Sequence, residues 1–198
     1  MKKFSRIIIV IFLNLMVYFN YYGISFDNYE SEMNEKYKFV ENGVKLCYKT
    51  NNSKEEEKEK ILKVINKQYD GYIDIMQDKI VFDNVIVKFI NNSNYLNVEI
   101  SIINTNAQSS TKEILSNIKK IKKTFNWSEY KYFKVKVDDS DKLKKQFERI
   151  IREKFLDISN GYIAQITDKS MQQISMAICK YDTGDFLLMA TPVIYTSF

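Results

Sequence analysis

A short internal repeat constrains the fold of this chain of 198 residues more than any other feature of its sequence. Gly71-Tyr72-Ile73 recurs ninety positions later as Gly161-Tyr162-Ile163. Asp78-Lys79 recurs in the same register, without a gap, as Asp168-Lys169. Because the flanking segments also match by residue type, the repeat predicts two copies of one structural unit.

A strand and then a helix open each predicted copy. Val44–Lys49 lies opposite Lys134–Asp139 in the repeat register, and alternating apolar and polar residues in this region indicate a half-buried strand. A Ser-x-x-Glu capping box then predicts a helix over Ser53–Lys67. Apolar residues at helical spacing predict its counterpart over Asp141–Leu156.

Three strands are expected after each helix. The Gly-Tyr-Ile segments supply the first of them. Val81–Ile90 lies opposite Met171–Lys180 as the second, and Leu96–Ile103 lies opposite Phe186–Val193 as the third. A further capping box opens a predicted linking helix from Ser110 to about Phe125.

These elements predict an α+β fold in which a duplicated β-α-β-β-β unit forms one curved antiparallel sheet with helices on one face. Each unit alone is too small to bury its own sheet, whereas two joined units share one core. The expected organisation is an export segment at 1–25, an N-terminal helical segment at 26–41, the first repeat with the linking helix at 42–126, and the second repeat at 127–198.

The N-terminus has the pattern of an export signal. Three basic residues, the last of them Arg6, precede an apolar run from Ile7 to Tyr22. Gly23 and Ser25 are small residues of the kind that a signal peptidase requires. Cleavage and retention as a signal anchor are both open. We therefore expect a protein that is secreted or anchored to the outer face of the cytoplasmic membrane, with membrane contact only through residues 1–25 if they are retained.

The charge of the exported part argues against nucleic-acid binding. The whole chain carries 30 basic and 25 acidic residues, a formal charge of +5. Residues 1–25 hold three of the basic and none of the acidic residues, so the remainder has 27 against 25, or +2. Lysines such as Lys45 and Lys134 on the first strands are equally common on solvated strands. No nucleic-acid partner is expected unless the N-terminus is not an export signal.

The chain lacks the residue types of the most common catalytic and metal sites. It has no histidine and only two cysteines, Cys47 and Cys179. Ser-His-Asp, Cys-His and histidine–zinc sites cannot be built without histidine. The sequence does not decide whether the two cysteines pair. We expect no catalytic residue, no metal site and no cofactor.

Three polar segments resemble sites, but each has a structural explanation. Ser109–Lys112 matches the Ser-x-x-Lys pattern of penicillin-interacting enzymes, yet its partner motifs are absent and a helix cap explains the hydroxyls. The carboxylates of Lys54–Lys60 fit a solvated helix face. Asp138, Asp139 and Asp141 fit the start of a helix rather than a calcium loop.

Two copies of strand, helix and strands joined by a helix resemble the TATA-box-binding-protein-like fold. The export signal, the segment Phe39–Val44 and the ending Met189–Ile194 give a narrower resemblance, over about residues 30–198, to the YwmB family of exported proteins of spore-forming Firmicutes. Ala190 stands where that family usually has glycine, and Tyr195–Phe198 departs from its usual acidic-aromatic end. The resemblance implies a role in cell-wall or sporulation biology and no known catalytic activity.

One stretch of the last predicted strand indicates a binding surface. If Phe186, Leu188 and Ala190 face the helices, the intervening residues face away and leave an apolar stripe on the open side of the sheet. The alternative is that residues 27–41 or the linking helix cover this stripe. The candidate partner-binding face comprises Leu187, Met189, Thr191, Val193 and Tyr195 in the second copy, and Tyr95, Asn97 and Glu99 in the first.

Together these features predict an exported, non-enzymatic, envelope-associated protein that binds a protein or cell-wall partner through its open sheet face. The alternative is an envelope hydrolase or transferase that uses Asp, Glu, Ser, Lys or Tyr. Such an enzyme would need a cleft with converging polar side chains, and the sequence shows no such set.

Overall fold

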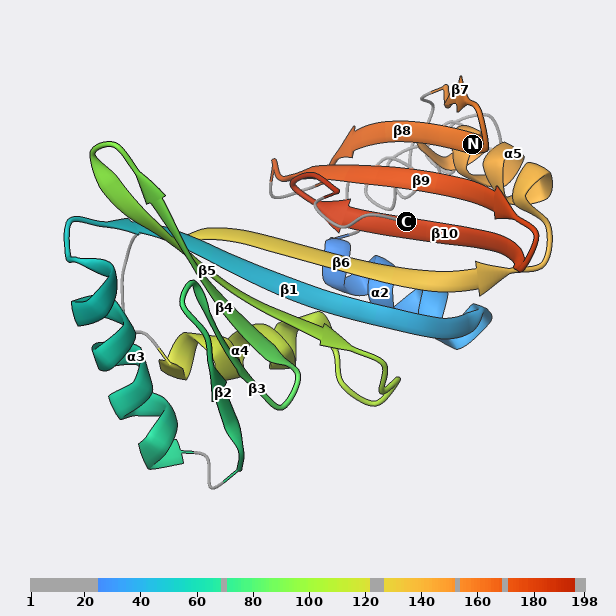
Figure 1. The fold of residues 1–198 in the computed structure, drawn as a ribbon. Coiled ribbons are helices and arrows are strands. Elements are labelled where there is room, and N and C mark those ends of the chain that lie inside the picture. The colour runs from blue at the N-terminus through green and yellow to red at the C-terminus, as the bar shows by residue number, and fades with distance from the viewer. Residues whose placement is uncertain (1–24, 69–70, 122–126, 152–153, 169–170, 195–198) are drawn as a thin grey trace, which may run out of the picture. The chain divides into compact units, whose positions relative to one another are not determined.

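A computed structural model describes residues 25–68, 71–121, 127–151, 154–168 and 171–194 of this chain (Figure 1). The chain divides into two compact units. The central unit is Phe39–Lys134, and the terminal unit combines the described residues up to Lys38 with Val135–Ile194. None of the described helices is long and apolar enough to span a membrane. The expected export segment lies outside the described residues except for Ser25.

The described residues form four helices and ten strands. The helices are α2 (Phe26–Lys36), α3 (Lys54–Gln68), α4 (Thr111–Ile121) and α5 (Ser140–Ile151). The strands are β1 (Lys38–Thr50), β2 (Ile73–Ile75), β3 (Lys79–Phe82), β4 (Val85–Asn92), β5 (Tyr95–Asn104), β6 (Ser128–Val137), β7 (Leu156–Ile158), β8 (Gly161–Thr167), β9 (Gln173–Tyr181) and β10 (Gly184–Thr191).

The ten strands belong to one antiparallel sheet in the order β2-β3-β4-β5-β1-β6-β10-β9-β8-β7. The predicted α+β class with a single antiparallel sheet is therefore confirmed. Ten strands are present where eight were predicted, because α3 and α5 are each followed by four strands instead of three. The boundary between the two units falls within β6.

Both predicted capping boxes are confirmed. Ser53 N donates to Glu56 Oε2 at 3.0 Å while Glu56 N donates to Ser53 Oγ at 3.2 Å, and α3 begins at the next residue. Ser110 and Glu113 exchange the same two bonds, at 3.0 and 3.3 Å, where α4 begins. Each box satisfies backbone N–H groups that the first helical turn would leave unpaired.

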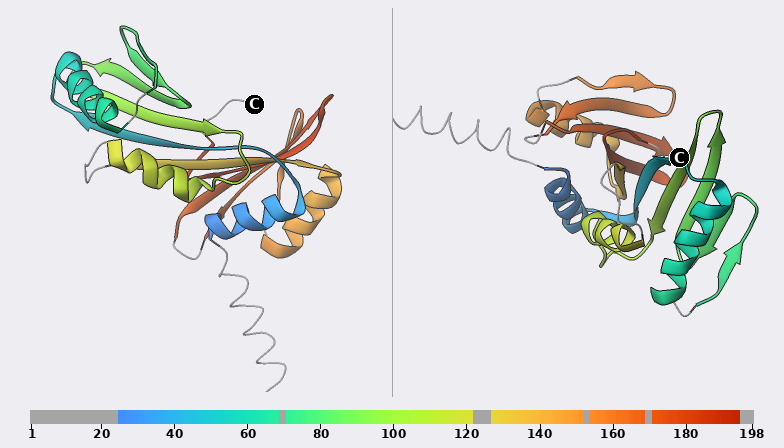
Figure 2. Two further views of the ribbon diagram at one scale, coloured as in Figure 1. Left: turned by 90° about the horizontal axis from the view of Figure 1, so that it is seen from below. Right: turned by 90° about the vertical axis from the view of Figure 1, so that its left-hand side faces the viewer.

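The core of the central unit lies between its strands and the helices α3 and α4 (Figure 2). In β5 every second residue is buried, from Leu96 to Ile102, and these residues pack with Ile61 and Ile65 of α3 and Ile118 of α4. Fully burying one such aliphatic side chain contributes about 1.5–3 kcal/mol. One face of these strands therefore holds the unit together and leaves the other face to solvent.

In the terminal unit, α5 contacts β8, β9 and β10. The ring of Phe147 on α5 lies 6.4 Å from Tyr29 of α2 and 6.4 Å from Phe155, which precedes β7. Phe147, Tyr29 and Phe155 are all buried. These aromatic rings join α2, α5 and the segment that leads into β7.

The strand predicted at Val81–Ile90 is two strands, because a two-residue turn at Asp83 and Asn84 divides it. Phe82 pairs with Val85 across this turn, and Asp83 has a φ of +48°. This left-handed conformation suits Asp because its short polar side chain tolerates it. Asp83 and Asn84 interrupt the apolar run, and the prediction overlooked this two-residue turn signal between two short apolar segments.

The helix predicted over Asp141–Leu156 ends at Ile151, and Leu156 already belongs to β7. Similarly, the N-terminal helical segment predicted at 26–41 is helical only to Lys36, and β1 begins at Lys38. Tyr37 between them is extended, with φ of −127° and ψ of 163°. In both places apolar residues occur at spacings that fit a helix or a strand, so the boundary was misplaced.

The repeated Gly-Tyr-Ile segments occupy different places in the sheet. Gly71-Tyr72 precedes the edge strand β2, whereas Gly161-Tyr162 begins β8, one strand in from the edge. Gly161 has a φ of +154°, and a Cβ there would lie 1.9 Å from the carbonyl oxygen of Ile178. Gly71 has no such close neighbour. The ungapped ninety-residue register therefore does not align strands at equivalent positions in the sheet.

Candidate binding surfaces

The apolar stripe expected on β10 is not exposed, and this expectation is corrected. Leu187 and Met189 have no exposed surface, and Thr191 is only 6% exposed. Leu188 and Ala190 between them are buried as well, so β10 is covered on both faces. A continuous apolar run fits a doubly buried inner strand, whereas the prediction assumed one open face.

The two other residues expected in this stripe follow β10. Val193 is 40% exposed and lines a pocket described below. Tyr195 lies outside the described residues. Of the five stripe residues, Val193 is therefore the one that the structure places at an accessible surface.

Tyr95, Asn97 and Glu99 lie on the face of β5 that points away from α3 and α4, where they were expected. Each is partly exposed and alternates with a buried neighbour. The Nζ of Lys49 lies 4.4 Å from the centre of the Tyr95 ring, and the Nζ of Lys45 lies 3.9 Å from Glu99 Oε1. This face is therefore polar, and its charged and aromatic groups contact one another.

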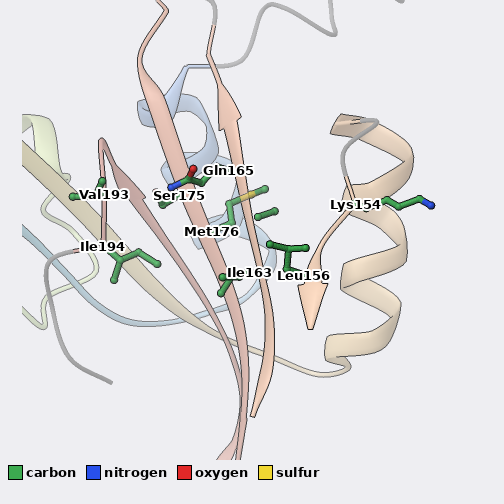
Figure 3. A pocket seen from close by; sticks show the side chains of 9 residues that line it. Lys154, Leu156, Ile163, Gln165, Ser175, Met176, Val193 and Ile194 are labelled. Atoms are coloured by element: carbon green, nitrogen blue, oxygen red, sulfur yellow. The ribbon is translucent and has the colours of Figure 1, made fainter. Parts of the chain in front are cut away.

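A largely apolar pocket of about 640 Å³ lies in the terminal unit, and we call it the edge pocket (Figure 3). Three consecutive residues of β8 take part in its lining, and consecutive strand residues point to opposite faces. The pocket therefore runs along the edge of the strand. Its lining residues are Lys154, Leu156, Ile163, Ala164, Gln165, Ser175, Met176, Val193 and Ile194.

The edge pocket exists because β7 covers only part of β8. β7 pairs with Gly161–Ile163, and no described strand pairs with Ala164–Thr167 on that side. The chain before β7 turns away from β8 to bury Phe155 against Phe147 of α5. The burial of one aromatic ring is thus accompanied by a half of β8 that pairs with no strand among the described residues on this side.

The hydrogen-bond pattern shows which backbone groups face the uncovered side. Lys180 N donates to the oxygen of Asn160 at 2.7 Å, and Asp168 N donates to the oxygen of Gln172 at 2.8 Å. In an antiparallel pair, residues bonded to the partner strand alternate with residues whose N–H and C=O point the other way. The even-numbered residues of β8 therefore bond β9, and Gln165 and Thr167 direct their N–H and C=O groups to the open edge.

Two polar side chains that line the edge pocket are held by hydrogen bonds. Ser175 Oγ donates to the oxygen of Pro192 at 3.1 Å, and Gln165 Oε1 accepts a bond from Gln173 Nε2 at 2.9 Å. Among the described lining residues, Lys154 is the one that carries a charge at neutral pH.

A polar cluster joins the start of α5 to β8 and β9. Tyr162 OH donates to Asp141 Oδ1 at 2.5 Å, and Lys180 Nζ lies 3.0 Å from both oxygens of Asp141. The bonds from Tyr162 and Lys180 lower the pKa of Asp141, and the bond to Asp141 raises the pKa of Lys180. These groups satisfy one another at an exposed surface and do not line the edge pocket. They hold α5 against the sheet.

One carboxylate of the acidic run in α3 is buried, which the solvated-face interpretation did not foresee. Glu57 has no exposed surface, and it accepts bonds from Tyr48 OH at 2.6 Å and Asn52 Nδ2 at 2.7 Å. Burial and the bond to Glu57 raise the pKa of Tyr48. The sequence signal was the position of Glu57, which lies four residues before the buried Ile61 and therefore on the same helix face.

The remaining predicted sites have structural roles. Ser110 of the Ser-x-x-Lys segment caps α4, and Asp139 Oδ1 accepts a bond from Lys142 N at the start of α5. Cys47 and Cys179 do not form a disulfide with each other. Within the described ranges, no group of three or more carboxylate or thiol side chains is arranged to hold a metal ion.

Comparison with models of known protein families gave no match for this chain, and neither did a search of curated proteins.

Proposed function

We propose that this chain is an exported, non-enzymatic, envelope-associated protein that binds a polypeptide partner in the edge pocket. The observation that carries the proposal is the composition of this pocket: it is open to solvent, and its described lining is mostly apolar with one charged residue, Lys154. Pockets of this kind bury apolar ligand groups, while a few polar groups set their orientation. The exposed Leu156 and Val193 at its rim are the type of surface that a partner covers.

Export rests on the N-terminal sequence. The basic residues that end with Arg6, followed by the apolar run Ile7–Tyr22, are typical of a signal that is cleaved or retained as an anchor. Surface protease treatment of intact cells and mass mapping of the mature N-terminus test this part. We expect digestion from outside. Protection from protease together with an intact Met1 would contradict export.

We further propose that the fold arose by duplication and is related to the TATA-box-binding-protein-like fold and the YwmB family. Each half of the chain has a strand, a helix and four strands. Counted outward, the sheet order is β1-β5-β4-β3-β2 in one half and β6-β10-β9-β8-β7 in the other, which supports duplication. The resemblance to that family also leads us to propose a role in cell-envelope or sporulation biology.

Photocrosslinking in intact cells tests partner binding. A photoreactive phenylalanine analogue replaces Leu156, which is 68% exposed at the edge pocket. The matched control carries the analogue at Lys112, which is exposed on α4 of the central unit. We expect one discrete crosslinked protein from Leu156 that is absent from the control. Crosslinks to glycan alone would indicate a cell-wall ligand, and the absence of any crosslink would contradict the proposal.

A further inference from the structure

We propose that the open edge of β8 binds an extended polypeptide segment by strand addition, antiparallel to β8 and in line with β7. This inference rests on the proposed polypeptide-binding function and specifies how the edge pocket would recognise its partner. Two independent observations meet at the same place: the half of β8 that lacks a described partner strand on its β7 side, and the apolar pocket beside it.

The backbone supplies the first part of the recognition. Gln165 and Thr167 direct their N–H and C=O groups away from β9, as the bonds at Asn160 and Asp168 establish. An added strand opposite Ala164–Thr167 can bond to these groups without disturbing the β8–β9 pairing. Main-chain bonds of this kind give affinity, and pockets for alternate side chains give specificity.

The pocket supplies the second part. In an added strand, side chains on one face enter the space lined by Leu156, Ile163 and Val193. The partner segment must therefore carry apolar residues at alternate positions. Four residues in a strand span about 13 Å, so the segment is short.

The direction of the added strand follows from that of β7, and a positive charge lies at its C-terminal end. β7 runs antiparallel to β8 from Leu156, which pairs with Ile163. A strand added in the same direction opposite Thr167 to Ala164 ends beside Lys154 and Leu156. Lys154 is exposed there, and no acidic residue occurs among the lining residues that the structure describes. The partner therefore carries an acidic side chain or a free carboxylate at the C-terminal end of the bound segment.

The structure favours a foreign segment over a second copy of this chain. In an edge-to-edge dimer two β8 strands would pair with each other, and the apolar hollow between Leu156 and Val193 would stay unfilled. A foreign segment with apolar side chains fills that hollow and uses the edge at the same time. The experiment must therefore distinguish binding of a foreign segment from self-association of this chain.

The test uses the purified full chain and a displayed library of random octapeptides as the probe. We expect enriched peptides with alternating apolar residues and an acidic residue near the C-terminal end. Gln165→Pro removes the outward N–H and leaves the backbone bonds between β8 and β9 in place, because the backbone of Gln165 does not bond β9, and proline is tolerated at strand edges. It also removes the side-chain bond from Gln173, which the alanine control removes as well. Gln165→Ala is the matched control that retains the N–H. We expect proline to weaken peptide binding about tenfold and alanine to change it less than twofold.

A second measurement keeps the test valid if Gln165→Pro fails to fold. N-methyl groups are placed in turn on each amide of the enriched peptide, and binding to the unmodified protein is measured. We expect losses of about tenfold at alternate positions only, because only every second amide faces β8. Equal effects at all positions, or no enriched peptide at all, would overturn strand addition.

The outcomes also separate this inference from the proposed function. If Gln165→Pro binds the peptide normally while Leu156→Asp does not, the pocket binds polypeptide without strand addition, and only this inference fails. If neither variant changes peptide binding, both strand addition and the proposed binding function fail. A monomer–dimer equilibrium in sedimentation that Gln165→Pro abolishes would assign the edge to a second copy and overturn the foreign segment.

Discussion

The ring of Phe155 lies 6.4 Å from the ring of Phe147, with their planes inclined by 56°. This contact joins the segment before β7 to α5 and draws the chain away from β8. It links the packing of the terminal unit to the open strand edge, because the same turn that buries Phe155 leaves Ala164–Thr167 uncovered.

Replacement of Phe155 tests this contact. Phe155 is 6% exposed, so Phe155→Ala should lower the free energy of unfolding by about 3 kcal/mol. Leu156→Ala is the control, since this neighbouring side chain is 68% exposed and should matter by less than about 0.5 kcal/mol. Urea unfolding monitored by circular dichroism measures both. If the free energy of unfolding fell by similar amounts in the two variants, the Phe155 ring would not be an important packing contact.

The buried pair of Tyr48 and Glu57 predicts a second stability effect. Tyr48→Phe removes the 2.6 Å bond to Glu57 and leaves a buried carboxylate with one donor fewer. We expect a loss of about 1–3 kcal/mol. Tyr95→Phe serves as control, because Tyr95 is partly exposed on the opposite face of the sheet. If the two variants were equally stable, Glu57 would not depend on the Tyr48 hydroxyl.

The Asp141 cluster predicts a pH dependence with a defined sign. The pKa of Asp141 is lowered below its ordinary 3.8 by the bonds from Tyr162 and Lys180. The folded protein therefore favours the carboxylate. Its contribution to stability is present above the unfolded-state pKa and is lost as the pH falls through the folded-state pKa.

Thermal unfolding of the wild-type protein and Asp141→Asn at several pH values measures this effect. We expect a lower melting temperature for the variant at pH 7 and a difference that closes in acid below the ordinary pKa. A constant difference across this range would contradict a role for the ionised carboxylate.

The raised pKa of Cys47 predicts that its thiol reacts slowly with disulfide reagents. Burial raises its pKa from 9.0 to about 11, so the reactive thiolate is scarce at neutral pH. In the native protein at pH 8 we expect Cys47 to react with a disulfide reagent more slowly than a model peptide thiol. The contribution of Cys47 to stability should fall as the pH rises from 9.0 to about 11, and the comparison with Cys47→Ala isolates it. Reaction at the rate of the peptide would refute the raised pKa.

The sequence predicted correctly those helix starts and strands that depend on interactions between residues close together in the chain. The capping boxes at Ser53 and Ser110 place the starts of α3 and α4 within one residue. The alternation of Leu96–Ile103 predicted β5 and the polar outward face that holds Tyr95 and Glu99. Side-chain hydrogen bonds and strand periodicity act within a few residues, and the sequence displays them directly.

The features that the sequence did not reveal depend on contacts between distant residues. The edge pocket depends on Phe155 meeting Phe147. The burial of Leu187 and Met189 depends on β10 being covered on both faces, which the sequence of one strand does not encode. Among the candidate residues on β10 and beyond, Val193 lines the pocket, and its neighbours in the lining come from β7, β8 and β9.

Amide hydrogen exchange along β8, measured residue by residue by NMR, tests the open edge most directly. We expect slow exchange at Ala164 and Ile166, whose N–H groups bond β9. We expect fast exchange at Gln165 and Thr167, whose N–H groups face outward. Addition of the enriched peptide should slow Gln165 and Thr167 alone. Uniform protection of all four amides in the isolated protein would show that the edge is already covered and would contradict the account.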